Sequence, residues 1–271
     1  MKRTLLTLAA VAALSSLSTA AETGLLGRSI ALAGQRYLYP VYVPLDWAPT
    51  QKWPVVLFLH GNGSQGSDGL RHIPVGSLIA AIRAHRDRFP AVIVFPQARE
   101  GTRWSTPAMQ DMVLAQLDSA IEEFNGDPTR VYLTGFSMGG GGVVRIASRW
   151  PERFAALIDM SGRISVNGTT RDQPSTDEDV RTHAYLRSAD PYDEAARLIR
   201  AIPIWVFHGG ADQTVPVQES RRLVTALKAV GADVRYTEYP GLDHNPTPPQ
   251  AWGEKGLSQW LFAQHRPEAA K

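Results

Sequence analysis

Short apolar runs alternate with longer segments of helical periodicity along most of this chain. Residues 55–60 and 91–95 are almost continuously apolar, as expected of strands buried on both faces of a sheet. Residues 107–124 carry apolar side chains at helical spacing, which predicts an amphipathic helix. This alternation predicts an α/β fold with a mostly parallel central sheet and helices on both faces.

The same alternation of strands and helices extends along most of the chain. Further strands are predicted at 37–43, 130–135, 154–160, 202–208 and 234–239, and further helices at 74–88, 139–149, 217–230 and 254–265. Residues 163–200 break the rhythm, because they are polar and longer than an ordinary connection. They are expected to form either a lid or a plain surface excursion within a single domain that spans residues 22–271.

The first residues differ in composition from the rest. Two basic residues precede an apolar run from Leu5 to Leu14, and small residues follow it. This order is typical of a secretory signal peptide over residues 1–21, with cleavage near Ala20 or Ala21. An anchoring or amphipathic helix is the alternative, although the run is shorter than the about 20 residues that a bilayer requires. We therefore expect a secreted or periplasmic protein without a membrane anchor.

Composition narrows the function classes. Hydrophobic residues make up 44% of the chain, which is enough for a sizeable core. The 28 Lys and Arg face 26 Asp and Glu, and two of the basic residues belong to the leader, so the mature charge is near zero. Nucleic acid is therefore not an expected partner. The absence of cysteine excludes disulfides, thiolate metal ligands, a cysteine nucleophile and a lipoprotein anchor.

The motif at residues 135–139, Gly-Phe-Ser-Met-Gly, has the form G-x-S-x-G. It follows a predicted strand and precedes a predicted helix, which is the setting of a nucleophile elbow. Bulky residues on either side of such a tight turn would clash, and the helix start points backbone N–H groups at the reacting centre. The pentapeptide alone also fits an ordinary glycine-rich turn. In this setting it predicts that Ser137 is a nucleophile.

A nucleophilic serine needs a base and an acid that orients the base, and in this kind of fold the acid precedes the histidine. The histidines after Ser137 are His183, His208, His244 and His265. His244 lies just past a predicted strand and is the predicted base. Asp212, in the loop after the preceding strand, is the predicted acid, with Asp193 as its rival. Asp243 is discounted because it is adjacent to His244 in sequence, so its side chain would face away from the imidazole ring.

The loop after the first buried strand begins His60-Gly-Asn-Gly. The backbone N–H of Asn62, with Gly63 as the alternative, is predicted to form an oxyanion hole with the N–H of Met138. His60 is expected to support this loop by hydrogen bonds. Trp104 follows another buried strand and is a tentative pocket residue, with core packing as the equal alternative. No metal or organic cofactor is expected, since the chemistry of a serine triad needs none.

Four stretches carry a family resemblance: VLFLHGNGSQGSD at 56–68, TGFSMGG at 134–140, IWVFHGGAD at 204–212 and YTEYPGLDHN at 236–245. They resemble a branch of bacterial secreted esterases near feruloyl esterases and polyhydroxybutyrate depolymerases, often labelled predicted peptidases or phospholipase/carboxylesterase-like. The resemblance runs from about Pro54 to His244. It implies an α/β-hydrolase fold with the triad positions named above, although residues 245–252 form a longer segment than this branch leads us to expect.

The sequence as a whole predicts a serine carboxylic-ester hydrolase that works through an acyl-enzyme. The expected substrates are small or aryl esters, such as acetyl or feruloyl esters, free or linked to a polymer. Activity is expected to fall at acid pH as His244 becomes protonated. The alternatives are a peptidase or amidase on the same triad, and a binding protein that keeps the fold without catalysis.

Overall fold

The computed structural model describes residues 22–74, 78–164 and 183–267. The predicted signal peptide, residues 1–21, lies outside the described residues, as does the stretch 165–182 of the predicted lid or excursion. Both remain predictions from the sequence.

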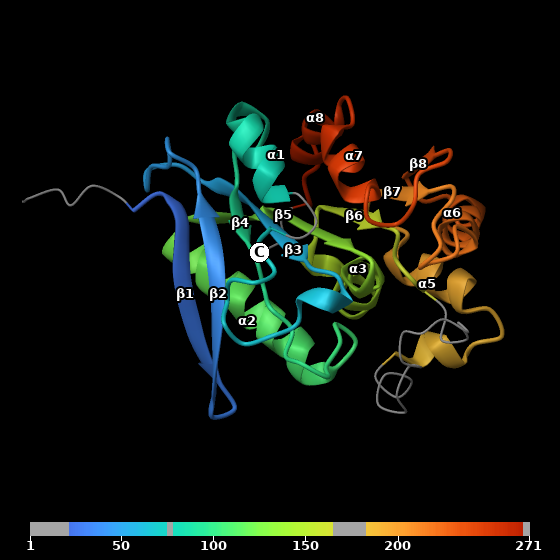
Figure 1. Cartoon of the computed structure of the whole chain (residues 1–271), viewed down its shortest axis with the longest axis horizontal. Coiled ribbons are helices and arrows are strands. Elements are labelled where there is room, and N and C mark those ends of the chain that lie inside the picture. The colour runs from blue at the N-terminus through green and yellow to red at the C-terminus, as the bar shows by residue number, and fades with distance from the viewer. Residues whose placement is uncertain (1–21, 75–77, 165–182, 268–271) are drawn as a thin grey trace, which may run out of the picture.

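An eight-stranded sheet runs through the described part of the chain, in the order β1-β2-β4-β3-β5-β6-β7-β8 (Figure 1). The strands are β1 (Gly24–Leu32), β2 (Gln35–Val43), β3 (Trp53–Leu59), β4 (Val92–Val94), β5 (Gly126–Phe136), β6 (Ala156–Met160), β7 (Ile204–Gly209) and β8 (Val234–Tyr239). Strands β3 to β8 pair in parallel, while the hairpin of β1 and β2 joins antiparallel to β4. The predicted mostly parallel sheet of an α/β-hydrolase fold is confirmed.

Helices cover both faces of this sheet (Figure 1). They are α1 (Leu78–Ala84), α2 (Pro107–Glu123), α3 (Met138–Arg149), α5 (Pro191–Ile199), α6 (Gln218–Ala229), α7 (Thr247–Gly253) and α8 (Leu257–Phe262), with short 3-10 helices at Asn62–Ser64, Arg86–Arg88, Pro151–Arg153 and Ala184–Arg187. Alternate residues of β3 divide between the two cores, since Leu57 belongs to the core that holds buried residues of α2, α3, α5 and α6, whereas Phe58 belongs to the core that holds those of α1, α7 and α8. Burial on both faces explains why the sequence of β3 is continuously apolar.

Two predicted helices differ from the structure. The helix expected at 254–265 is shortened to α8 at Leu257–Phe262, which begins after a turn in which Gly256 has φ +82°, and a separate short helix that was not predicted, α7, precedes that turn. That left-handed conformation favours glycine and interrupts a continuous helix. The helix expected at 74–88 is helical over α1 and then tightens into a 3-10 turn. Strand β1 was not predicted at all.

The described end of the predicted excursion is a packed helix. Asp190 caps α5, because its Oδ1 accepts the backbone N–H of Tyr192 at 2.9 Å. Tyr192, Ala196 and Ile199 are buried in the core shared with α3 and α6. Residues 190–199 are therefore part of the helical layer, and the lid hypothesis concerns residues outside the described part of the chain.

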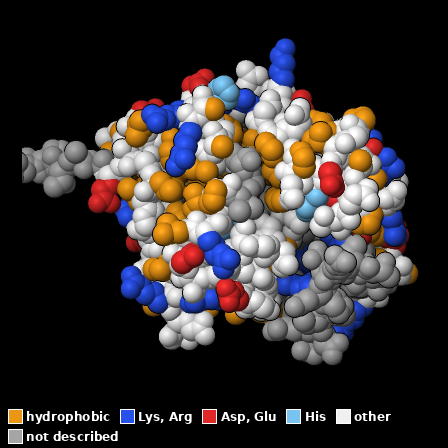
Figure 2. All heavy atoms as spheres, in the orientation of Figure 1, with side chains coloured by type: hydrophobic (Ala, Val, Ile, Leu, Met, Phe, Trp, Pro, Cys, Tyr) orange, Lys and Arg blue, Asp and Glu red, His pale blue; other side chains and the backbone are white. Residues whose placement is uncertain are grey.

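Charges of both signs are mixed over the surface that Figure 2 shows, with hydrophobic side chains between them. This mixture matches the near balance of acidic and basic residues in the sequence. Among the described helices, none is both long enough and apolar enough to cross a bilayer.

Candidate active site

Ser137 lies on a strained corner between β5 and α3. Its backbone has φ +58° and ψ −115°, a conformation that non-glycine residues rarely adopt. A Cβ atom on Gly135 would lie 2.3 Å from the carbonyl oxygen of Gly139, and one on Gly139 would lie 1.9 Å from that of Leu59. Only glycine fits at these two positions, so the motif allows strand and helix to meet with the serine at their junction.

The structure brings Ser137, His244 and Asp212 together in one hydrogen-bonded chain. His244 Nε2 lies 2.8 Å from Ser137 Oγ, and His244 Nδ1 lies 2.6 Å from Asp212 Oδ2. The three residues follow β5, β8 and β7 respectively, whose carboxyl ends meet at one edge of the parallel sheet. Phe136 packs its ring 4.6 Å from the His244 ring, between centroids, and supports the imidazole from one side.

The carboxyl group of Asp212 is buried and surrounded by donors. Burial by itself raises its pKa, but N–H groups of His208, His244 and Val215 outweigh that effect and hold the pKa well below its usual range. Oδ1 accepts the backbone N–H groups of Thr214 and Val215, both at 2.8 Å. The group is therefore a carboxylate at any ordinary pH, and its Oδ2 accepts a hydrogen bond from the Nδ1–H of His244.

The rival acids lie elsewhere. Asp193 is exposed in the first turn of α5. Asp243 Oδ1 accepts the backbone N–H groups of Gln213 at 2.9 Å and His244 at 2.7 Å, so it fixes the loop and not the imidazole ring. Of the carboxyl groups weighed from the sequence, the structure places only Asp212 against the His244 ring.

The loop after β3 lies beside the nucleophile. A Cβ atom on Gly61 would be 3.5 Å from Ser137 Cβ, so the loop backbone reaches the serine. Asn62 follows as the first residue of a 3-10 helix, and Gly63 lies one position further along. Met138 is the first residue of α3, so its N–H belongs to the helix-end amides that have no acceptor within the helix. Asn62 and Met138 are thus the sequence neighbours of Gly61 and of Ser137 itself, and their role as oxyanion donors stays a prediction.

His60 holds the loop after β3 in place through hydrogen bonds of its ring. Ala98 donates its N–H to His60 Nε2 at 3.0 Å, which leaves Nδ1 as the protonated nitrogen that donates to the Gly61 carbonyl at 2.7 Å. Burial lowers the pKa of His60 to about 3, so the ring stays neutral. The prediction that His60 supports the loop through hydrogen bonds agrees with these contacts.

Trp104 is not a pocket residue. Its side chain is 1% exposed, and its Nε1–H donates to the His60 carbonyl at 2.9 Å. The indole meets the His60 ring edge-on, at 4.9 Å between centroids. The tentative placement in the substrate pocket was therefore wrong, because this side chain turns into the core, where it contacts the start of the loop after β3.

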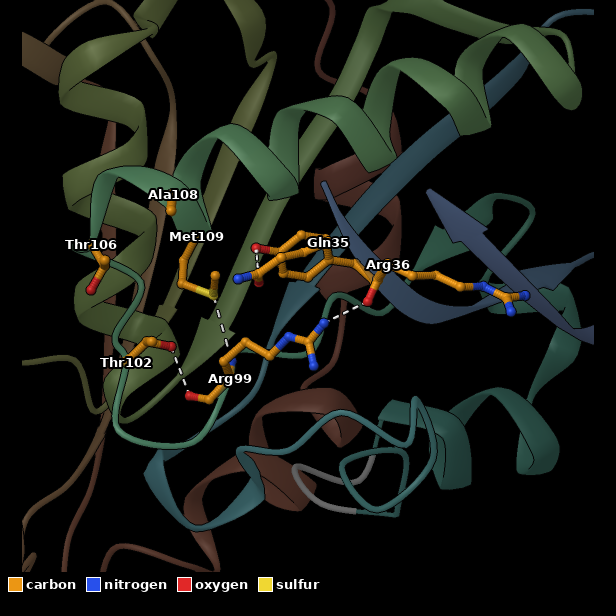
Figure 3. Close-up of a pocket in the computed structure, with 8 residues that line it drawn as sticks. Gln35, Arg36, Arg99, Thr102, Thr106, Ala108 and Met109 are labelled. Carbon is orange, nitrogen blue, oxygen red and sulfur yellow. Dashed lines mark hydrogen bonds between the residues drawn. The ribbon is translucent and has the colours of Figure 1, made fainter. Parts of the chain in front are cut away.

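A cavity of about 590 Å³ lies between the β1–β2 hairpin and the start of α2 (Figure 3). Arg36, Arg99, Thr102 and Met109 are among its walls, and the Arg99 guanidinium lies 4.7 Å from the centre of the Tyr37 ring. None of the triad residues lines it. This cavity is distinct from the edge that holds Ser137.

No group of three or more His, Asp or Glu side chains in the described residues is arranged to hold a metal ion. The chemistry available at this site is that of an activated serine beside backbone N–H donors. A fold of this topology with a serine elbow, a histidine and a buried carboxylate defines the α/β-hydrolase class of serine hydrolases.

Within that class, residues 101–265 match the prolyl oligopeptidase family, and the chain belongs to this family. It is 25% identical over 149 residues to acyl-protein thioesterase 1 of Gibberella zeae, covering 55% of this chain and 53% of that protein. The chain spans about half the length of the first curated relatives that it matches.

Solved structures give the same class. A thermostable esterase is 30% identical, with a TM-score of 0.71 over 89% of this chain and 63% of that chain. A ferulic acid esterase is 16% identical, with a TM-score of 0.66 over 88% of this chain and 98% of that chain, a similarity of fold alone. Family and relatives together support serine hydrolase activity.

Proposed function

We propose that this protein hydrolyses carboxylic esters, with Ser137 as nucleophile, His244 as general base and Asp212 as the orienting acid. The observation that carries the proposal is the unbroken chain from Asp212 Oδ2 through His244 to Ser137 Oγ, with contacts of 2.6 and 2.8 Å. This chain ends at a serine held on a strained strand-to-helix corner.

In the first step, Ser137 Oγ attacks the carbonyl carbon of the ester while His244 Nε2 takes its proton. The resulting imidazolium is stabilised by the Asp212 carboxylate. The N–H groups of Met138 and Asn62, with Gly63 as the alternative to Asn62, stabilise the tetrahedral oxyanion, where one such donor contributes about 3 kcal/mol.

The alcohol then leaves with the proton from His244, and an acyl-enzyme remains on Ser137. In the second step His244 removes a proton from water, which attacks the acyl carbon. The acid is released and the serine recovers its proton. No metal or organic group takes part in this sequence.

For the substrate we propose small or aryl esters, such as acetyl or feruloyl esters, free or attached to a polymer. The sequence resemblance and the likeness to a thermostable esterase support this class. We also propose that residues 1–21 direct the chain to the periplasm or the medium. N-terminal sequencing of protein recovered from cell fractions tests that part, and a mature chain that still begins at residue 1 contradicts it.

Amide hydrolysis is the second candidate, favoured by membership in the prolyl oligopeptidase family. The same triad serves both reactions, but an amide has the poorer leaving group. An ester and an anilide with one common acyl group separate the two candidates. A kcat/KM for the anilide equal to or above that for the ester would favour the peptidase reading.

The test of the proposal uses purified residues 22–271 on a panel of acetyl, butyryl, octanoyl and feruloyl esters. Ser137→Ala is the control and should lose nearly all turnover. A fluorophosphonate probe should label Ser137 in the wild type and nothing in the variant. Near wild-type hydrolysis by the variant would refute the mechanism, and failure of the wild type to be labelled would favour a binding protein that keeps the fold without catalysis.

A further inference from the structure

A second histidine lies against the carboxylate that orients His244. His208 is the residue before the last of β7, and its side chain is completely buried. Its Nε2 lies 3.3 Å from Asp212 Oδ2, the same oxygen that contacts His244, and 3.0 Å from the carbonyl oxygen of Val215. Two histidines therefore share one oxygen of the candidate triad acid.

The protonation of His208 at this contact follows from its neighbours. Nε2 faces a carboxylate oxygen and a carbonyl oxygen, neither of which has a hydrogen to give, so Nε2 carries the proton whether the ring is neutral or charged. Nδ1 lies 2.7 Å from the hydroxyl of Ser220 on α6. That contact prevents rotation of the ring, and it keeps the Nε2–H directed at Asp212.

Other charged groups also face His208. Asp159 on β6 is fully buried, and burial raises its pKa to about 6, while its electrostatic interaction with His208 acts in the opposite direction. Glu238 pairs with His208 in the register of β7 and β8 and has an electrostatic interaction with it. His208 thus lies among Asp212, Asp159 and Glu238, and of these Asp212 is the one that also contacts His244.

We propose that His208 is a positioning residue of the triad. It shares its Nε2–H between Asp212 Oδ2 and the carbonyl oxygen of Val215, and so it sets both the position and the effective charge of the carboxylate that contacts His244. This inference rests on the proposed triad. Without the Nε2–H of His208, His244 is the one ring N–H donor left at Asp212 Oδ2 among the described residues. That oxygen then stabilises the imidazolium form of His244 more strongly. The carboxylate also loses a contact that limits its rotation.

The two amide variants of His208 separate this role from a structural one. His208→Gln places an amide N–H near the position of Nε2, whereas His208→Asn reaches only the position of Nδ1 and the Ser220 hydroxyl. We expect the Asn variant to lower kcat about tenfold, with little change in KM, because a small misplacement of the base is costly. The acid limb of its pH–rate profile should move up by about half a pH unit. The Gln variant should recover most of both.

The measurement is the rate of fluorophosphonate labelling of Ser137 across pH 5 to 9 (about two units either side of neutrality), alongside hydrolysis of p-nitrophenyl acetate. His183→Asn is the matched control, since His183 is another buried histidine, bonded to Gln110 on α2. It should lower the melting temperature without moving the acid limb. If His208→Asn does not fold, Ser220→Ala replaces it, and it should shift the same limb in the same direction.

An acid limb and kcat at wild-type values in the Asn variant overturn the proposal, as does equal impairment of the Asn and Gln variants. If Asn does not fold, an unchanged Ser220→Ala variant overturns it. These outcomes differ from failure of the proposed function, which appears as a wild-type enzyme that neither hydrolyses the ester nor reacts with the probe.

Discussion

Replacement of Gly139 by alanine tests the elbow directly. The added Cβ would lie 1.9 Å from the carbonyl oxygen of Leu59, 2.6 Å from its carbonyl carbon and 2.9 Å from the carbonyl oxygen of His60. An ordinary carbon–oxygen contact is about 3.3 Å or longer. Because all three neighbours are backbone atoms of β3 and its loop, no side chain can rotate away, and α3 or the loop must move by about 1 Å or more.

Such a shift separates Ser137 from the N–H groups of the loop after β3. A displacement of this size at a catalytic group costs about 100-fold in rate, and overpacking typically destabilises by about 1–3 kcal/mol. For a domain of this size the melting temperature should fall by roughly 2–12 °C. We expect kcat for a p-nitrophenyl ester to fall about 100-fold, measured per active site by fluorophosphonate titration.

Gly27→Ala is the matched control, because a Cβ atom on Gly27 of β1 meets nothing within 4 Å. It should keep the kcat and melting temperature of the wild type. A Gly139→Ala enzyme with wild-type kcat and melting temperature would mean that β3 and α3 do not approach as closely as the structure shows.

Three further outcomes follow from the same structure. Asp159→Asn should stabilise the protein by on the order of 2 kcal/mol at pH 7.5 and leave its stability unchanged at pH 4. Burial raises the folded pKa of Asp159 to about 6, above its ordinary 3.8, so the wild-type protein loses stability as the pH rises through that window. Thermal melts at both pH values check this, and equal effects at the two would contradict it. Trp104→Phe removes the Nε1–H bond to the His60 carbonyl and should cost about 1 kcal/mol in a denaturant titration, with a few-fold loss of kcat; an unchanged midpoint and kcat would show that the indole does not support the loop. Ester hydrolysis should survive EDTA, and loss of activity that one divalent metal restores would contradict a metal-free triad.

The strands β3, β4, β6 and β7 were predictable because all of their residues are buried, whereas the edge strand β8 was predicted although it is only half-buried. Strands β3, β5, β6, β7 and β8 lie within a few residues of the predicted ranges, except that β5 starts four residues earlier than expected. Strand β1 escaped prediction for the opposite reason. It alternates between half-buried and exposed positions and contains Gly27 and Arg28 in its interior, so it has no continuous apolar run.

The candidate triad was predictable from order along the chain, because residues after parallel strands share one edge of the sheet. Ser137, Asp212 and His244 meet there, as that argument expects. The direction of a side chain within a loop is not given by its position in sequence. Trp104 follows a strand at the same edge, yet its indole turns into the core. The contact of His208 with Asp212 likewise depends on tertiary packing.

The long sequence separation within the triad has a consequence for folding. Ser137 and His244 are 107 residues apart, and the strand that precedes His244 is the last of the sheet, at its edge. Contacts between residues so far apart in sequence are expected to form late in folding, because the entropy cost of closing the long loop between them must be met first. During refolding, tryptophans buried in the core, such as Trp53 and Trp104, should report collapse before the serine becomes reactive. Reactivity of Ser137 thus reports on the docking of β8, the last strand along the chain.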